Sequence, residues 1–300
     1  MSPSARTVAA GLGCRHRIDE PLSRHTSFRI GGPAELMAFP GTETELSAVL
    51  RLARAAGLPY LVLGNGTNLL VGDRGYRGVV IKLTQEFRRA ERSGSEVTVG
   101  AGSSLPRLVA FCLEQGLAGM EWAVGIPGSV GGALVMNAGA YGGQMSDVVA
   151  EVWGLLPGGR RRVIPARLIR FGYRQARYPD GFVITGCRLR LRPGRRQTIR
   201  SAMAGWLAKR ARNQPLTVPS AGCVFKNPAN DSARRLIGLA GMRGKCVGGA
   251  QVSAKHANFI VNRGGATAAD VLALARRVRA AVDRELGVRL VPEIKLVGER

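Results

Sequence analysis

WAVGIPGSVGGALVMNAGAYGG, residues 122–143, is a tract rich in glycine and alanine. Its density of glycine and alanine is not explained by helix or strand propensity. Small side chains over such a length predict that something flat or bulky lies against the segment. Glycine-rich packing between elements is the alternative, but it does not account for the full string in this order.

A second glycine-rich segment, GNGTN, lies upstream and consists of Gly64, Asn65, Gly66, Thr67 and Asn68. Apolar runs over 60–63 and 79–83 predict strands on both sides of it. Small residues in such a loop let several backbone N–H groups converge on an anion, so a pyrophosphate would suit it. An ordinary tight turn is the alternative for this short string alone. The G-x-G-x-x-G strand-to-helix pattern is absent, which weakens a Rossmann interpretation.

Periodicity around these loops predicts an α+β chain. Thr42 and Glu45 form a capping-box pattern and Gly57 ends the apolar period, which predicts a helix over 42–56. Thr267 and Asp270 cap a long amphipathic helix near the C-terminus. The other predicted helices cover 105–115, end before 213 and open at 231, and the other predicted strands cover 148–156, 162–164 and 182–191.

These elements group into three segments. We predict a first lobe over 17–83, a second lobe over 84–195 and a C-terminal domain over 196–300, whose last strand could return to the first lobe. A chain of 300 residues can bury one large core or two to three smaller ones, so the length agrees with a multi-lobed enzyme.

The formal net charge of +24 could attract nucleic acid, an anionic membrane or a phosphorylated small molecule. Arginine is spread from Arg6 to Arg300, and the densest cluster, 160–162, lies in a predicted hairpin turn. Aromatic residues make up 5% and are not interleaved with the basic runs, so no stacking motif for nucleic acid is present. Solvated charges are favoured, and a basic nucleic-acid-binding protein is the alternative from another class of function.

The five cysteines are odd in number and include no C-x-x-C pair, which predicts neither a disulfide framework nor a zinc site. No apolar run approaches the ~20 residues that a membrane span needs. Arginines interrupt the N-terminal segment where a signal peptide would be apolar. We therefore expect a cytoplasmic protein with no metal site and no membrane partner.

Motifs outside the glycine-rich tract carry a resemblance to a known family. They are HTSFRIGG from His25, FGYR from Phe171, PSAGCVFKNP from Pro219, HANFIVNRGGATAADV from His256 and VPEIKLVG from Val291. The motifs occur in the order typical of the UDP-N-acetylenolpyruvoylglucosamine reductase family. The chain resembles this family from about residue 17 to residue 298. No lid insertion is evident between 178 and 187, which is similar to the shorter, type II branch.

The resemblance implies a two-lobed FAD-binding domain of the vanillyl-alcohol-oxidase (PCMH) type, followed by a C-terminal α+β domain that binds a UDP-sugar. It also implies NADPH as co-substrate. Both glycine-rich segments are then expected to hold FAD. The residues expected to do so are Gly64, Asn65, Gly66, Thr67 and Asn68 in the first segment and Gly125, Ile126, Pro127, Gly128, Ser129, Gly132 and Ala133 in the second.

The implied reaction reduces an enol ether that bears a carboxylate. Hydride goes from the flavin to the terminal vinyl carbon, charge moves toward the carboxylate, and an acid protonates C2. Arg174 and Glu293 match the residues that would steady this charge, and Glu293 helps only if its pKa is raised or a water intervenes. Outside these motifs, Arg174 would be better interpreted as a solvated arginine, and Glu293 as a strand glutamate paired with an arginine.

Cys223 occupies the position of the proton donor, where the family usually has serine. A thiol with a pKa of ~8.5 is a better acid than an alcohol and is mostly neutral at pH 7, so function is expected to survive. The enzyme should, however, be sensitive to thiol reagents. A buried, inert cysteine is the alternative outside this motif.

The remaining expected contacts are with the substrate. Tyr173 would line the pocket, and Lys226 and Asn227 could contact the substrate, with Lys226 a candidate for the diphosphate. His25 and His256 are expected to be structural or pocket-lining. The alternative activity is that of another FAD-linked oxidase or dehydrogenase of the same fold. That alternative does not explain why Arg174, Cys223 and Glu293 occur together. The expected partners are the UDP-sugar and NADPH, and a monomer is favoured.

Overall fold

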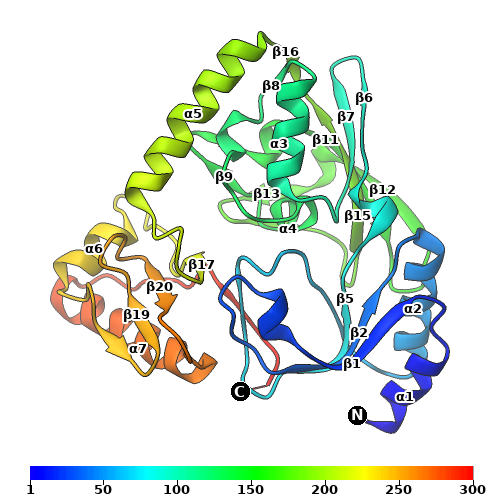
Figure 1. Cartoon of the computed structure of the whole chain (residues 1–300), viewed down its shortest axis with the longest axis horizontal. Coiled ribbons are helices and arrows are strands. Elements are labelled where there is room, and N and C mark those ends of the chain that lie inside the picture. The colour runs from blue at the N-terminus through cyan, green and yellow to red at the C-terminus, as the bar shows by residue number, and fades with distance from the viewer. Residues whose placement is uncertain (300) are drawn as a thin grey trace. The chain divides into compact units, whose positions relative to one another are not determined.

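The computed structural model describes residues 1–299 (Figure 1). Contacts divide the chain into two compact units. Unit 1 comprises Met1–Asp19, Glu35–Asn65 and Gly78–Arg210, and unit 2 comprises Glu20–Ala34, Gly66–Arg77 and Ala211–Arg300. The chain passes between the units several times, so neither unit is one continuous segment. The segments 17–83, 84–195 and 196–300 remain predicted functional domains.

A four-stranded sheet in the order β1-β2-β5-β3 lies mostly in unit 1. Helix α2 (Glu43–Ala55) begins where Thr42 accepts a hydrogen bond from Glu45 N, as its sequence predicted. Its buried face, which includes Leu46 and Leu50, belongs to one apolar cluster with the sheet. The strands are β1 (Arg15–Pro21), β2 (Pro33–Phe39), β5 (Tyr76–Ile81) and β3 (Tyr60–Val62), and helix α1 is Pro3–Ala10.

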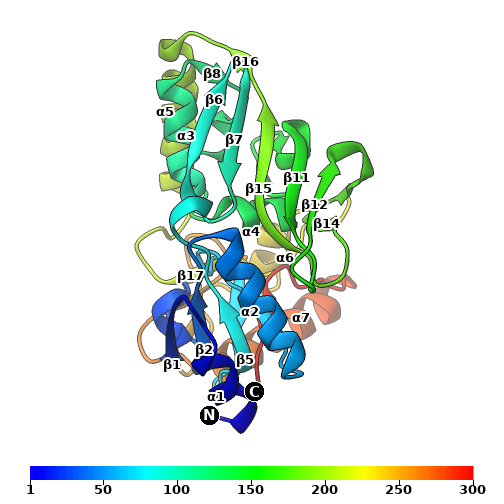
Figure 2. The same cartoon turned by 90° about the vertical axis from the view of Figure 1, so that its right-hand side faces the viewer.

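The second sheet of unit 1 has five antiparallel strands, which lie side by side in the order β12-β11-β15-β7-β6 (Figure 2). Arg188 makes ion pairs with Glu96 at 3.0 Å and with Glu151 at 3.2 Å. Part of the positive charge is therefore neutralised within the sheet. The strands are β12 (Arg161–Pro165), β11 (Val149–Leu155), β15 (Val183–Arg190), β7 (Glu96–Gly100) and β6 (Ala90–Ser93).

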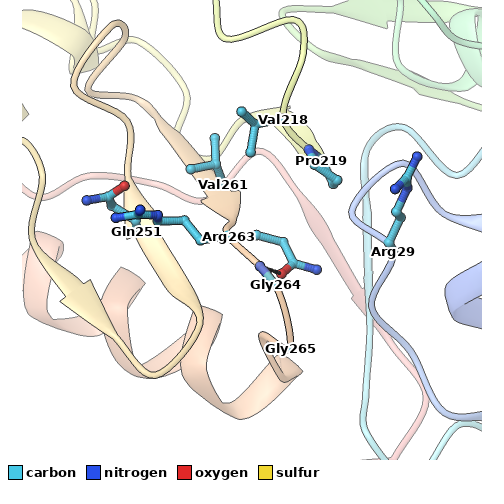
Figure 3. Close-up of a pocket in the computed structure, with 9 residues that line it drawn as sticks. Arg29, Val218, Pro219, Gln251, Val261, Arg263, Gly264 and Gly265 are labelled. Atoms are coloured by element: carbon cyan, nitrogen blue, oxygen red, sulfur yellow. Dashed lines mark hydrogen bonds between the residues drawn. The ribbon is translucent and has the colours of Figure 1, made fainter.

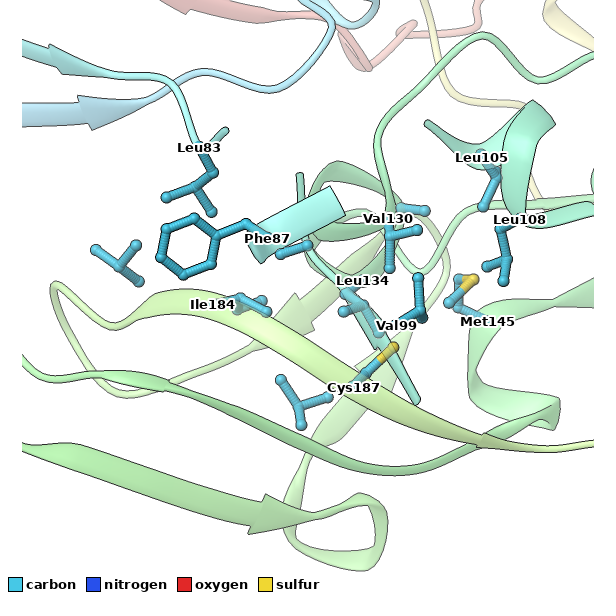
Figure 4. Packing of buried hydrophobic residues seen from close by; sticks show 14 of the residues in the cluster. Leu83, Phe87, Val99, Leu105, Leu108, Val130, Leu134, Met145, Ile184 and Cys187 are labelled. Atoms are coloured by element: carbon cyan, nitrogen blue, oxygen red, sulfur yellow. The ribbon is translucent and has the colours of Figure 1, made fainter. Parts of the chain in front are cut away.

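Two helices bury their apolar faces on this second sheet. Helix α3 (Leu105–Glu114) contributes Leu105 and Leu108, and helix α4 (Val130–Val135) contributes Val130 and Leu134, to the cluster that contains Val99 and Cys187 (Figure 4). Helix α4 lies inside the glycine-rich tract, where the sequence predicted no regular element. Ser129 caps it by accepting a hydrogen bond from Gly132 N, and this bond together with burial of the apolar face offsets the poor helix propensity of glycine.

Short elements complete unit 1. The two-residue pairs are β8 (Leu117–Ala118) with β16 (Arg192–Pro193) and β9 (Gly139–Ala140) with β10 (Gly143–Gln144), and the hairpin is β13 (Arg170–Gly172) with β14 (Gln175–Arg177). Helix α5 is Arg196–Asn213. The 3₁₀ turns of the chain are η1 (Leu22–His25), η2 (Gln85–Arg88), η3 (Glu121–Ala123), η4 (Met145–Asp147) and η5 (Ala166–Leu168).

Unit 2 has its own sheet, β17-β20-β19-β18, and two helices around one apolar cluster. Helix α7 (Ala268–Leu286) has the predicted Thr267–Asp270 capping box and ends at the left-handed Gly287. Helix α6 (Ala233–Leu239) begins two residues later than predicted, because Ser232 rather than Asp231 caps it. The strands are β17 (Ser220–Cys223), β20 (Phe259–Asn262), β19 (Ala250–Val252), β18 (Cys246–Val247) and the parallel pair β4 (Leu69–Val71) and β21 (Lys295–Val297).

The fold is therefore α+β, as expected. Among residues 1–299, no helix has both the length and the apolar character that a membrane span requires. Within the same described range, no group of three His, Cys, Asp or Glu side chains is arranged to hold a metal ion.

Candidate functional site

Gly64 and Asn65, the part of the first glycine-rich segment that belongs to unit 1, meet the second segment there. Asn65 Nδ2 donates a hydrogen bond to Pro127 O at 2.8 Å. A Cβ atom on Gly64 would lie 2.1 Å from Ser129 Oγ, so only glycine allows this approach. Within the described chain, none of the backbone N–H groups of 64–67 donates a hydrogen bond. Adjacent free N–H groups beside a close backbone contact fit the diphosphate of a dinucleotide.

Gly64→Ala should therefore weaken FAD binding. Ser129 is 3% exposed and its hydroxyl already caps helix α4, so the new methyl group cannot be accommodated without moving the loop. We expect the FAD content of the purified protein to fall at least tenfold and the stability to fall by about 1–3 kcal/mol. Absorbance at the flavin band relative to protein, and thermal unfolding, measure the two effects.

Gly205→Ala is the matched control for this substitution. Gly205 lies in helix α5, and a Cβ atom there would meet nothing within 4 Å. Alanine at that position should leave the FAD content unchanged and raise stability slightly, because alanine is the better helix former. An unchanged FAD content in Gly64→Ala would remove this loop from the cofactor site.

The second half of the first loop is fixed within unit 2. Gly66 has a φ of 61°, and its carbonyl accepts hydrogen bonds from the backbone N and the hydroxyl of Ser27. Asn68 Nδ2 donates to Glu293 O at 3.3 Å, and Lys295 N donates to Asn68 O at 2.9 Å. The predicted cofactor loop is thus hydrogen-bonded directly to the segment that carries a predicted catalytic carboxylate.

Cys223 and Glu293 lie on neighbouring segments of unit 2. Cys223 is the last residue of β17, and its side chain is half-buried. Glu293 N donates to Val224 O at 2.8 Å, and Lys226 N donates to Val291 O at 2.8 Å. The C-terminal segment therefore runs along the segment that follows Cys223, although the two are about 70 residues apart in sequence.

Lys226 and Asn227 follow Cys223 in the same segment. Asn227 Oδ1 accepts a hydrogen bond from Ala233 N at 3.0 Å, so this side chain helps to begin helix α6. Asn227 is exposed and Lys226 is half-buried. The structure thus brings the proton-donor candidate, the carboxylate candidate and Lys226 into one hydrogen-bonded group of segments.

Arg174 and Tyr173 form the turn of the β13–β14 hairpin in unit 1, where Gly172 is paired with Gln175. Arg174 has a φ of 56°, a left-handed conformation that costs a non-glycine residue roughly 1–2 kcal/mol. Its guanidinium Cζ lies 5.2 Å from the centroid of the Tyr173 ring. Strain held at a residue of this kind is typical of functional sites.

The two histidines from the quoted motifs have different environments in unit 2. His25 Nε2 lies 2.9 Å from Glu20 Oε1, an ion pair when the ring is protonated. Burial, together with the nearby Arg234, lowers the pKa of His256 to about 4. His256 Nδ1 is buried without a hydrogen-bond partner in the described chain, and its ring meets Phe259 edge-on at 4.7 Å. A neutral imidazole fits this position.

The depressed pKa of His256 predicts a loss of stability in mild acid. Between pH 6.5 and about 4, the unfolded chain binds a proton at this residue while the folded chain does not, so the free energy of unfolding falls as the pH falls. The contribution is fully present above pH 6.5 and amounts to about 2 kcal/mol after allowance for partial exposure. Urea unfolding at pH 7.5 and pH 5 should differ less in His256→Gln than in the wild type, and an equal difference would contradict this assignment.

A cavity of about 610 Å³ lies elsewhere in unit 2, beside β20 (Figure 3). None of the residues predicted for catalysis, cofactor or substrate lines it. Asn262 in its wall is held by bonds to Phe28 O and from Gly264 N. The other lining residues are Arg29, Val218, Pro219, Gln251, Val261, Arg263 and Gly265.

Asn258 is the residue of this region that the sequence analysis did not single out. It is 2% exposed, and its side chain forms two hydrogen bonds with the backbone of Phe225, next to the Cys223 segment. Only its place in the HANFIVN motif could have pointed to it, since a buried asparagine has no periodicity of its own.

Two protein families match successive parts of the chain. Residues 214–297 match the family described as UDP-N-acetylenolpyruvoylglucosamine reductase, C-terminal domain, and residues 34–164 match the FAD binding domain family. A UDP-N-acetylenolpyruvoylglucosamine reductase 2 from Symbiobacterium thermophilum is 50% identical over 99% of this chain and 98% of its own length. The reductase from Moorella thermoacetica is 46% identical over 100% and 99%.

A solved structure gives the same result at the level of the fold. The crystal structure of the reductase from Thermus caldophilus has a TM-score of 0.82 and 40% sequence identity, and the match covers 94% of this chain and 98% of that one. Sequence and fold therefore agree over almost the whole length. The chain belongs to the UDP-N-acetylenolpyruvoylglucosamine reductase family.

Proposed function

We infer that this chain catalyses the NADPH-dependent, FAD-mediated reduction of UDP-N-acetyl-3-O-(1-carboxyvinyl)-glucosamine to UDP-N-acetylmuramate, a step of peptidoglycan precursor synthesis. The observation that carries this inference is the group of segments in unit 2. There, Glu293 is bonded through its backbone both to Val224, beside Cys223, and to Asn68 of the glycine-rich loop. An acid, a carboxylate and a cofactor loop in one hydrogen-bonded group are what this reduction needs.

The residues present fit FAD. The free N–H groups of 64–67 and the close approach of Gly64 to Ser129 support a role of both glycine-rich segments in holding its diphosphate. When bound, FAD supplies the hydride. The remaining FAD contacts that we propose are with Asn68, with 125–128 and with Gly132 and Ala133.

We propose the following roles for the catalytic candidates. Cys223, whose side chain is half-buried at the end of β17, gives its thiol proton to C2 of the substrate. Arg174 donates hydrogen bonds to the substrate carboxylate as negative charge moves toward it. Glu293 orients the same group by a hydrogen bond, either in its protonated form or through a water molecule.

The substrate contacts are also proposals. Tyr173, with 50% of its surface exposed beside Arg174, would line the pocket. Lys226 would meet the diphosphate of the UDP-sugar as a point charge, and Asn227 has an amide nitrogen available beyond its bond to helix α6. We further propose that the enzyme works in the cytoplasm. We also propose that it is a monomer, and sedimentation at several protein concentrations would test this oligomeric state.

An anaerobic visible spectrum tests the whole function. NADPH should bleach the flavin band of the purified protein, and the enolpyruvyl UDP-sugar should restore it. A flavin that bleaches but is not reoxidised by the sugar would assign the chain to another FAD-linked reaction. Absence of flavin after reconstitution with FAD, together with salt-dependent binding to DNA or RNA, would instead favour the basic nucleic-acid-binding alternative.

A further inference from the structure

The strand that carries Cys223 is irregular just before that residue, at which the strand ends. β17 is antiparallel to β20, with Cys223 opposite Phe259, and the register is irregular between Ser220 and Cys223. Gly222 lies at the irregularity with a φ of 76°, a conformation that bends the strand away from its neighbour. Backbone pairing with β20 alone therefore does not fix the segment that begins at Cys223.

Asn258 supplies the contacts that the ladder no longer provides. Its backbone carbonyl accepts a hydrogen bond from Val224 N at 2.8 Å. Its side-chain Oδ1 accepts one from Phe225 N at 2.9 Å, and its Nδ2 donates one to Phe225 O at 2.8 Å. Phe225 is 1% exposed, so water cannot replace these bonds. Because unpaired buried backbone groups are strongly unfavourable, loss of the amide would force this segment to shift.

The opposite edge of the same segment holds the carboxylate candidate. Glu293 N donates to Val224 O at 2.8 Å, and Lys226 N donates to Val291 O at 2.8 Å. The segment that follows Cys223 is therefore clamped between Asn258 on one side and the segment of Glu293 on the other. A shift of the central segment would change the position of Cys223 relative to Glu293.

We propose that Asn258 is a positioning residue that holds Cys223 in place relative to Glu293 and so sets the rate of proton transfer to the substrate. The proposal rests on the proposed function of Cys223 as proton donor. Displacement of a reacting group by about 1 Å can lower a rate by about 10²-fold, so loss of the clamp should have a large effect on one chemical step.

The first test compares the two half-reactions in Asn258→Ala. Reoxidation of the flavin by the enolpyruvyl UDP-sugar should slow by about 10- to 100-fold. Flavin reduction by NADPH, which needs no proton donor, should stay within about a factor of two. Asn258→Asp retains the acceptor for Phe225 N but loses the donor to Phe225 O, and it serves as the second variant if alanine prevents folding.

The decisive test is a double-mutant cycle with Cys223→Ala. If Asn258 acts through Cys223, then Asn258→Ala should have almost no further effect on reoxidation once the thiol is gone. A residue that only stabilises the fold would lower the rate by the same factor in both backgrounds. Equal losses in the two backgrounds would overturn the proposal.

Asn262→Ala is the matched control. Asn262 is another buried amide, on β20, and its side chain forms hydrogen bonds with Phe28 O, Gly264 N and Ala266 N, none of which belongs to the Cys223 segment. The Asn262→Ala substitution should lower the stability of the protein and leave the ratio of the two half-reaction rates unchanged.

Different measurements test the positioning role of Asn258 and the proposed function. If the wild-type flavin is not reoxidised by the sugar, the proposed function fails. Positioning is then tested by the rate at which iodoacetamide labels Cys223 in a Cys246→Ser background. That rate should change in Asn258→Ala, and an unchanged rate would overturn the positioning role by itself.

Discussion

Replacing Cys223 with alanine will lower the rate of flavin reoxidation by the enolpyruvyl UDP-sugar by roughly 10²- to 10⁴-fold, the usual contribution of a positioned general acid. Cys223→Ser will remain active, because a hydroxyl can give the same proton. Flavin reduction by NADPH will be unchanged in both variants, since no proton is delivered to the substrate in that step. Stopped-flow absorbance of each half-reaction measures these rates separately.

Thiol chemistry gives an independent check on Cys223. Cys14, Cys112 and Cys187 are buried, and burial raises the pKa of Cys112 to about 12, so these three should not react. Cys246 is exposed and must be replaced by serine before alkylation. In that background, one alkylated thiol should abolish turnover, and Cys223→Ser should make the enzyme resistant. Full activity in Cys223→Ala would remove this residue from catalysis.

Arg174→Gly should separate activity from stability. The left-handed φ of 56° suits glycine, so the variant should gain about 0.5–1 kcal/mol of stability. Loss of the guanidinium should lower the reoxidation rate by about 10²- to 10³-fold, because the charge that moves to the substrate carboxylate loses its donors. Arg174→Lys should be only partly active, since an ammonium group lacks the planar fork that matches a carboxylate.

Arg29→Gly is the matched control for Arg174→Gly. Arg29 also has a left-handed φ, 55°, and lines the cavity beside β20 rather than the catalytic group. The Arg29→Gly variant should gain a similar amount of stability and lose no turnover. Thermal unfolding and both half-reaction rates are measured for the two variants. If Arg174→Gly and Arg29→Gly changed these quantities to the same extent, the role of Arg174 would be contradicted.

Elements whose signals are local could be predicted from the amino-acid sequence. Thr42 and the Thr267–Asp270 capping box begin helices α2 and α7 at the predicted residues, because a cap needs only neighbours within one turn. The order of motifs along the chain likewise determined the family and the residue types available for catalysis. These features depend on contacts between residues that are close in sequence or on the letters themselves.

Where those residues lie depends on tertiary contacts. Helix α4 forms within a glycine-rich tract because apolar neighbours bury its face, in addition to its local Ser129 cap. Asn258 reaches Phe225, and Glu293 reaches Asn68, across separations of 33 and 225 residues. Such bonds join segments whose local sequence does not encode their partner, since the free energy that selects each pairing comes from burial and hydrogen bonding in the folded chain.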